Sequence, residues 1–189
     1  MSDQAPEGLP PGLLDERGAD RLHLGGHIPR TGWQIFNIQP GQHVDHVGDV
    51  CDLSRFADGS FDMVYASHTF EHLSHAGRLR KAIAEVARVL RPEGRFFISV
   101  PDLKILAALF SRPDMPDEAL YQIMIMIFGS HRDPHDFHQA GLWDGYLADL
   151  LIEAGFREIY RVESFGLFRD DSETQYDGVR ISLNLVAVK

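Results

Sequence analysis

Short apolar runs that end abruptly in small or polar side chains recur along this chain. The clearest run spans residues 61–66, follows a turn signal at 57–60 and becomes polar at Ser67 and His68. Similar runs occupy residues 21–24, 33–38, 46–47 and 96–100. A buried strand that ends in this way is typical of the edge of an open α/β sheet where ligands bind. The pattern therefore predicts several strands whose polar ends share one edge.

The second half of the chain shows helical periodicity. Apolar residues recur over 78–91 at the spacing of an amphipathic helix, and Pro92-Glu93-Gly94 is expected to end it before the next strand. This order predicts a parallel strand–helix–strand unit. Further helices are expected over 103–128, broken near 111–114, and over 144–154, with a polar loop at 129–141. The last two apolar runs, 157–163 and 181–188, have no helix between them and predict an antiparallel pair.

The first strands are connected by unusually short segments. About eight residues separate the run at 21–24 from that at 33–38, and the next connection is as short. Parallel neighbours normally need a crossover of about a dozen residues or more, usually with a helix. We therefore expect fewer helices in the N-terminal half and an apolar sheet face that either residues 1–20 or a second subunit covers.

Length and charge restrict the class of protein. The chain has 189 residues, enough for an arm over residues 1–20 and a single domain over 21–189. A net charge of −10 disfavours nucleic acid or an anionic membrane as the main partner. There is no apolar stretch long enough to cross a bilayer, no signal peptide pattern, and a single cysteine, Cys51. These features predict a cytoplasmic protein.

Several short strings together carry a family resemblance. They are Leu22–Gly26, Gly48–Leu53, Ser60–Leu73, Arg88–Gly94, Ser99–Leu103, Asp136–His138 and Ile181–Asn184. In this order and spacing they resemble the class I S-adenosylmethionine-dependent methyltransferases, in particular a bacterial branch similar to methyltransferase type 11. The resemblance covers about residues 21–189. It implies a Rossmann-like α/β fold with a mostly parallel seven-stranded sheet whose last strand is antiparallel, and S-adenosylmethionine as cofactor.

The resemblance also implies roles for single residues. The loop of Leu24, Gly25 and Gly26 would pass beneath the methionine part of the cofactor, and Asn37 and Gln39 would face the ribose. Asp49 and Val50 would frame the adenine, and Ser67 and His68 would line the methyl-transfer crevice. Two positions depart from the family pattern. His27 replaces the second glycine of the loop, and Gln39 replaces an acidic residue, so a charge-assisted contact to the ribose is lost.

Histidines are the candidate catalytic residues. Methyl transfer to a hydroxyl needs a base, and His138, in the polar loop, is the first choice, with His68 as the second. An equally open interpretation is that His138 only holds the loop by hydrogen bonding. His68, His72 and His75 have the spacing of one helical face, which suits a metal, but no His-Glu-x-x-His pattern accompanies them. We therefore predict no metal.

The resemblance implies S-adenosylmethionine-dependent methylation, and the branch that the chain resembles suggests an oxygen on a sugar, a glycan or another small molecule as the acceptor. The alternative is a non-catalytic, methyltransferase-like binding or assembly module with a degenerate cofactor site, which His27 and Gln39 would suit. A nicotinamide-dependent oxidoreductase is disfavoured because Gly25-Gly26 is not followed by the helix that a pyrophosphate needs. The apolar run 123–128 is expected to be core or a dimer interface rather than a substrate channel, and a homodimer is predicted.

Overall fold

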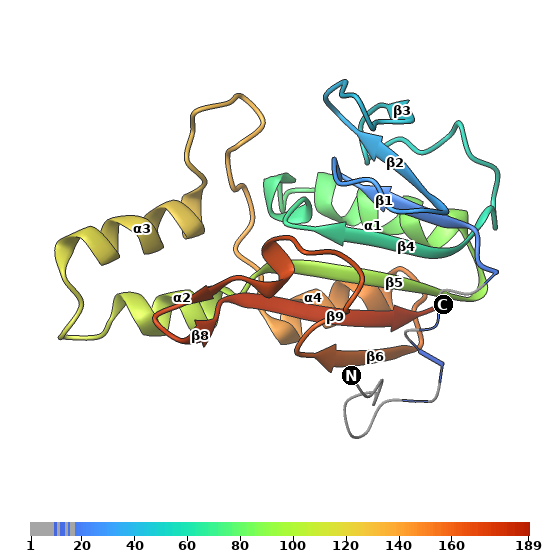
Figure 1. Ribbon diagram of the computed structural model, residues 1–189. Coiled ribbons are helices and arrows are strands. Elements are labelled where there is room, and N and C mark those ends of the chain that lie inside the picture. The colour runs from blue at the N-terminus through green and yellow to red at the C-terminus, as the bar shows by residue number, and fades with distance from the viewer. Residues whose placement is uncertain (1–9, 11, 14, 16–17) are drawn as a thin grey trace.

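The computed structural model describes residues 10, 12, 13, 15 and 18–189 and centres on a seven-stranded sheet (Figure 1). The strands lie in the order β3-β2-β1-β4-β5-β9-β6. Their bounds are β1 (Arg21–Leu24), β2 (Trp33–Asn37), β3 (His46–Val47), β4 (Phe61–Ser67), β5 (Leu90–Pro101), β6 (Glu158–Val162) and β9 (Ser182–Val188). The first five strands pair in parallel, and β9 pairs antiparallel with β5 and with β6. The predicted Rossmann-like sheet with an antiparallel last strand is thus confirmed.

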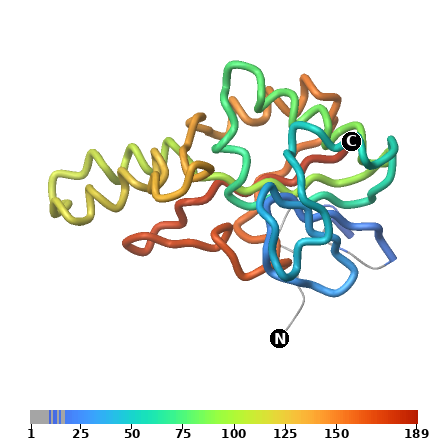
Figure 2. Tube along the Cα trace, turned by 90° about the horizontal axis from the view of Figure 1, so that it is seen from above, coloured from blue at the N-terminus to red at the C-terminus, as the bar shows by residue number. Residues whose placement is uncertain are grey.

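Four helices accompany the sheet in the described part of the chain. They are α1 (Arg78–Val89), α2 (Leu103–Phe110), α3 (Asp117–Phe128) and α4 (Asp144–Glu153). Helices α1 and α4 cover one face of the sheet, whereas α2 and α3 project together from the body of the molecule (Figures 1 and 2). None of the described helices is long and apolar enough to cross a membrane.

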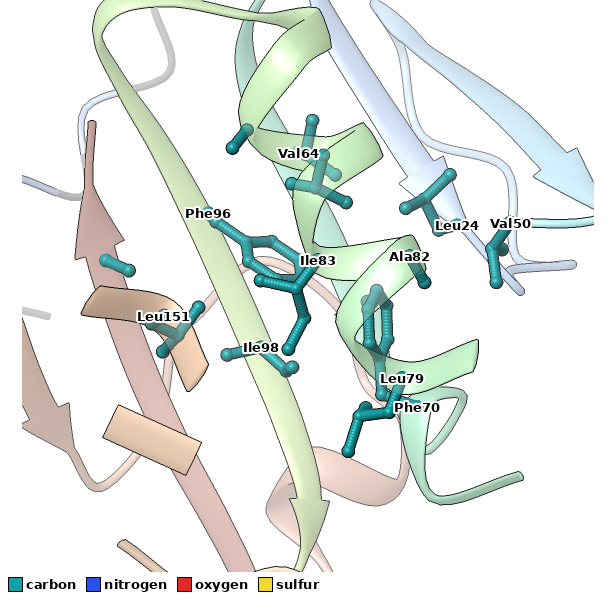
Figure 3. Packing of buried hydrophobic residues seen from close by; sticks show 14 of the residues in the cluster. Leu24, Val50, Val64, Phe70, Leu79, Ala82, Ile83, Phe96, Ile98 and Leu151 are labelled. Atoms are coloured by element: carbon teal, nitrogen blue, oxygen red, sulfur yellow. The ribbon is translucent and has the colours of Figure 1, made fainter. Parts of the chain in front are cut away.

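The face beneath α1 holds the main core. Leu79, Ile83 and Val86 recur every three or four residues along α1, so all three point to the sheet and are fully buried. They pack with Phe96 and Ile98 of β5 and with neighbouring apolar residues (Figure 3). The amphipathic pattern in the sequence therefore fixes where this helix lies.

The boundary after α1 differs from the prediction. Residues 92–94 were expected to separate the helix from the next strand, but β5 already begins at Leu90, which pairs with Phe61. The register then shifts, so that Met63 pairs with Arg95. Residues 92–94 therefore form an irregularity inside a strand, because the neighbouring edge of β4 offers a partner that the local Pro-x-Gly signal does not reveal.

Among the described residues, no α-helix covers the opposite face of the sheet. The connections 25–32 and 38–45 contain no helix, as expected. The segment after β6 covers this face instead, through Phe165, Leu167 and Phe168, which pack on Trp33 and its neighbours. Residues 165–168 form a loop. Leu13 of the predicted arm joins the same cluster, while most of residues 1–20 lies outside the described residues.

The projecting helices are only partly buried. Asp102 caps α2 by accepting hydrogen bonds from the N–H groups of Lys104 and Ile105. In α3 the run 123–128 buries Ile123, whereas the side chain of Phe128 is 56% exposed. The run is therefore not buried on all sides. A short hairpin, β7 (Gln175–Tyr176) and β8 (Val179–Arg180), lies before β9 and was not predicted.

Candidate functional site

The ends of four parallel strands meet at one cavity of about 320 Å³. The end of β1 contributes Gly25, the end of β2 contributes Asn37, and the residues after β3 and β4 contribute Asp49 and His68. Ligands of open α/β sheets bind at this edge. The volume falls at the lower end of the roughly 300–1,000 Å³ that small-molecule sites occupy.

Six of the predicted site residues line this cavity, namely Gly25, Asn37, Gln39, Asp49, Val50 and His68. The other four, Leu24, Gly26, Ser67 and His138, do not. Leu24 is fully buried in the core beneath α1. Thr69, His72 and Arg78 also line the cavity and were not among the predicted cofactor or catalytic residues.

The glycine loop after β1 is held by its own neighbours. Gly25 has a φ of 74°, and a Cβ there would lie 2.1 Å from the Thr69 hydroxyl oxygen. A Cβ on Gly26 would lie 2.4 Å from the His23 ring. The Asn37 amide donates to the carbonyl oxygens of both glycines at 2.9 Å. Glycine is therefore required at both positions by close packing, and the loop presents a fixed backbone to the cavity.

Asp49 is fixed at the far side of the cavity. Its carboxylate accepts a hydrogen bond from the Arg78 guanidinium at 2.8 Å and from the Cys51 N–H at 2.9 Å. Partial burial would raise the pKa of Asp49, but these hydrogen bonds lower it overall. Asp49 is therefore a charged acceptor, with its orientation set by the first residue of α1.

The loop 129–141 forms part of the cavity wall. Pro134, His135 and Phe137 contribute to its wall. The Gln39 side-chain amide donates to the Asp133 carboxylate at 3.2 Å, so the end of β2 is tied to this loop. Gln39, which was expected to face a ribose, thus has its amide nitrogen engaged by an acidic residue from the loop.

His68 lines the cavity immediately after β4. Its φ of 47° is in the left-handed region, which redirects the chain at the end of the strand. Its Nε2 lies 2.9 Å from the Ser182 hydroxyl oxygen, and that hydroxyl donates to the Asp171 carbonyl. Since the Ser182 proton is used, Nε2 of His68 carries the ring proton and Nδ1 carries the lone pair. Burial lowers the pKa of His68 to about 4, so the ring is neutral.

The predicted helical face of His68, His72 and His75 does not form. Residues Phe70–His72 make one 3-10 turn, η1, and α1 begins only at Arg78. The His75 ring is exposed and lies 3.0 Å from the Gln139 carbonyl oxygen. Glu71, which the helical spacing placed off that face, instead joins His72 and His138 in one cluster.

This cluster lies beneath the cavity wall. The rings of His72 and His138 meet edge to face, with centroids 4.7 Å apart. Burial raises the pKa of Glu71 to about 8 and lowers that of His138 to about 4. His138, the first choice for a base, does not line the cavity, whereas His72, on which its ring packs, does.

A larger hollow of about 610 Å³ lies at the opposite edge of the sheet. Its lining includes Asp62 near the start of β4, Arg95 of β5 and Glu158 at the start of β6, together with residues of the arm. The polar carboxyl ends of the parallel strands do not line this hollow. The smaller cavity is therefore the candidate site.

Comparisons with known proteins agree with this fold. Residues 35–98 match a family model described as a methyltransferase domain. This segment contains eight of the cavity residues named above: Asn37, Gln39, Asp49, Val50, His68, Thr69, His72 and Arg78. No curated protein sequence matches the chain.

Solved structures of methyltransferases share the architecture at low identity. An S-adenosylmethionine-dependent methyltransferase from Archaeoglobus fulgidus superposes with a TM-score of 0.57 and 19% identity, over 91% of this chain and 87% of that one. A 1,6-didemethyltoxoflavin-N1-methyltransferase from Burkholderia thailandensis, solved with S-adenosylhomocysteine, gives 0.54 and 19%, over 90% and 71%. This chain spans only 61% of a similar possible exported protein from Bordetella parapertussis and 50% of the CurJ carbon methyltransferase.

Proposed function

We propose that this chain binds S-adenosylmethionine in the cavity at the strand ends and methylates an oxygen atom. By its fold and its family match, the chain is a class I S-adenosylmethionine-dependent methyltransferase. The acceptor is a sugar, a glycan or another small molecule. The observation that carries the proposal is the convergence of four strand ends on one cavity within the segment that matches the methyltransferase family. Structural neighbours include carbon, nitrogen and oxygen methyltransferases, so the choice of oxygen rests on the histidines beside the cavity.

In this proposal the cofactor lies across the strand ends. The rigid loop Leu24–Gly26 supports the methionine part, and Asn37 with Gln39 faces the ribose. Asp49 accepts from the adenine amine, and the Val50 N–H meets a ring nitrogen. Ser67 ends the strand that leads into the crevice. The fixed backbone of the glycine loop and the charged Asp49 support this placement, because a preformed site loses little entropy on binding.

A base is needed when the acceptor is a hydroxyl. We propose His68 for this role rather than His138, because His68 lines the cavity and His138 does not. His138 then acts as a positioning residue that packs against His72. This reverses the order expected from the sequence.

Cofactor binding tests the proposal directly. Titration calorimetry with S-adenosylmethionine and S-adenosylhomocysteine is expected to show binding that falls about 10- to 100-fold in Asp49→Ala, since a hydrogen bond to a charged group contributes roughly 1.5–3 kcal/mol. Asp52→Ala is the matched control, because Asp52 is exposed and does not line the cavity. A folded protein with equal affinity in both variants would place the cofactor elsewhere.

One observation favours the alternative of a non-catalytic module. The Gln39 amide nitrogen, at the position where the family uses an acid, is already bonded to Asp133. If neither compound binds to a protein whose circular dichroism shows a folded state, the enzyme assignment is wrong and the module remains.

The proposal also includes location and assembly. We place the protein in the cytoplasm, which suits a chain whose single cysteine, Cys51, is free and buried. We further propose a homodimer through α2 and α3, where Phe110, Tyr121, Met124 and Phe128 expose apolar surface.

A further inference from the structure

Backbone hydrogen bonds join the turn η1 to the loop 129–141. The Glu71 carbonyl accepts from the N–H groups of Gln139 and Ala140 at 2.8 and 3.1 Å. The His138 N–H donates to the Phe128 carbonyl at 3.0 Å. These bonds fix the main chain on both sides of His138, so its ring is held beside His72.

The side chains that meet here are of the kind that ligate metals. One carboxylate oxygen of Glu71 and one ring nitrogen each of His72 and His138 all lie within 4.8 Å of one another. Glu71 Oε1 and His72 Nε2 are 3.9 Å apart. Two ligands that are each about 2.1 Å from the same ion lie at most about 4.2 Å apart. The three ligand atoms thus lie almost close enough together to bind one ion, and small side-chain rotations would bring them within range.

Glu71 Oε1 lies 3.6 Å from Nδ1 of His68 and 3.9 Å from Nε2 of His72, beyond hydrogen-bond distance of both. The Glu71 side chain is 2% exposed, and neither oxygen accepts a hydrogen bond from the residues that the structure describes. A buried carboxylate without a partner is costly, and such a group in a folded protein requires an explanation. A cation between Glu71 and the two imidazoles would supply one.

From this arrangement we propose that Glu71, His72 and His138 form a site for one divalent transition-metal ion. Two imidazoles with one carboxylate suit Zn²⁺, Fe²⁺ or Mn²⁺ better than Mg²⁺ or Ca²⁺, which prefer oxygen ligands alone. Three protein ligands leave coordination positions open, as in catalytic metal sites. Because His72 lines the cavity, the proposed site borders it.

The ion would act on the methyl acceptor, and this step rests on the proposed function. A divalent ion held by Glu71, His72 and His138 would lower the pKa of an acceptor hydroxyl beside it, so that the hydroxyl would give up its proton to a base more readily. The hydroxyl oxygen then bonds to the methyl carbon while the carbon–sulfur bond breaks, and S-adenosylhomocysteine leaves as a neutral thioether. The acceptor class is thereby narrowed to hydroxyl compounds.

Metal binding can be measured without cofactor. The tag-free protein, dialysed against chelator and then buffer, is titrated with Zn²⁺ and with Mn²⁺ by calorimetry, and bound metal is counted by elemental analysis. We expect one equivalent per chain, with affinity reduced at least 10- to 100-fold in His72→Ala, His138→Ala and the conservative Glu71→Gln. His43→Ala is the control, because His43 is exposed and outside the cluster.

The outcomes separate the two proposals. The metal site would be overturned if the wild-type protein bound no metal. It would also be overturned if the wild type and all three cluster variants bound metal equally, because the metal would then be bound by surface histidines outside the cluster. Circular dichroism of each variant checks that loss of metal does not reflect unfolding. If metal binds through the cluster but S-adenosylmethionine does not bind, the metal site stands and the methyltransferase proposal fails.

Discussion

At the scale of single residues, His23 shows how burial sets protonation in this molecule. Its side chain is 3% exposed, and its ring lies 4.3 Å from that of Phe168 and 4.9 Å from that of Tyr65. Burial lowers its pKa to about 4, so the native state holds the neutral ring at neutral pH. The unfolded state takes up a proton below about pH 6.5, which the native state does not. Stability is therefore lost as pH falls from 6.5 toward 4.

A variant without this titration is expected to resist acid better. Between pH 7.5 and 4.5 the wild type should lose roughly 2–3 kcal/mol more unfolding free energy than His23→Phe, which keeps a ring in the same pocket. Urea unfolding at both pH values measures the difference. Because the other buried histidines are unchanged in both proteins, their contributions cancel. An identical pH dependence would mean that His23 is protonated in the native state.

At the scale of elements, the loop after β6 replaces helices. Phe168 packs on the rings of His23, Trp33 and Tyr65, with centroids 4.3, 5.3 and 4.7 Å away. Removing a buried phenylalanine side chain costs about 3–5 kcal/mol. Phe168→Ala is therefore expected to destabilise the protein by about that amount and to increase binding of an apolar dye to the uncovered sheet.

The comparison for this prediction is Ile152→Ala. Ile152 is also a large apolar residue, but it is 58% exposed and lies outside α2 and α3, so its truncation should change stability by less than about 1 kcal/mol. Thermal and urea unfolding give both values. Similar losses in the two variants would show that the loop does not cover the sheet in solution.

The strands and α1 were predictable because their signals are local. An apolar run that ends in Ser67 and His68, or a helix marked by Leu79, Ile83 and Val86, can be recognised within a short window. Which segment covers the second face of the sheet was not predictable, because Phe168 and Trp33, whose rings are in contact, lie far apart in the sequence. The same holds for the Glu71–His72–His138 cluster. The left-handed φ of His68 and the single 3-10 turn change the angular positions that helical spacing assumed.

At the scale of the whole molecule, the projecting pair α2 and α3 gives a protein of net charge −10 an exposed apolar surface. If a second copy covers this surface, a charge there will oppose association. Phe128→Asp is expected to shift the mass in light scattering from dimer to monomer, whereas Ile152→Asp on α4, at a residue 58% exposed, should not. A monomeric wild type at micromolar concentration would contradict the proposed dimer.

The segment after β6, which covers one face of the sheet, also determines when that face can be buried during synthesis. Strands β1, β2 and β4 leave the ribosome early, yet Phe165, Leu167 and Phe168, which shield one of their faces, follow about a hundred residues later. A nascent chain therefore holds an uncovered sheet face until translation has passed residue 170. Such a face attracts chaperones and favours aggregation. Slow translation across residues 100–160 should lower the soluble yield of this protein more than slow translation after residue 170.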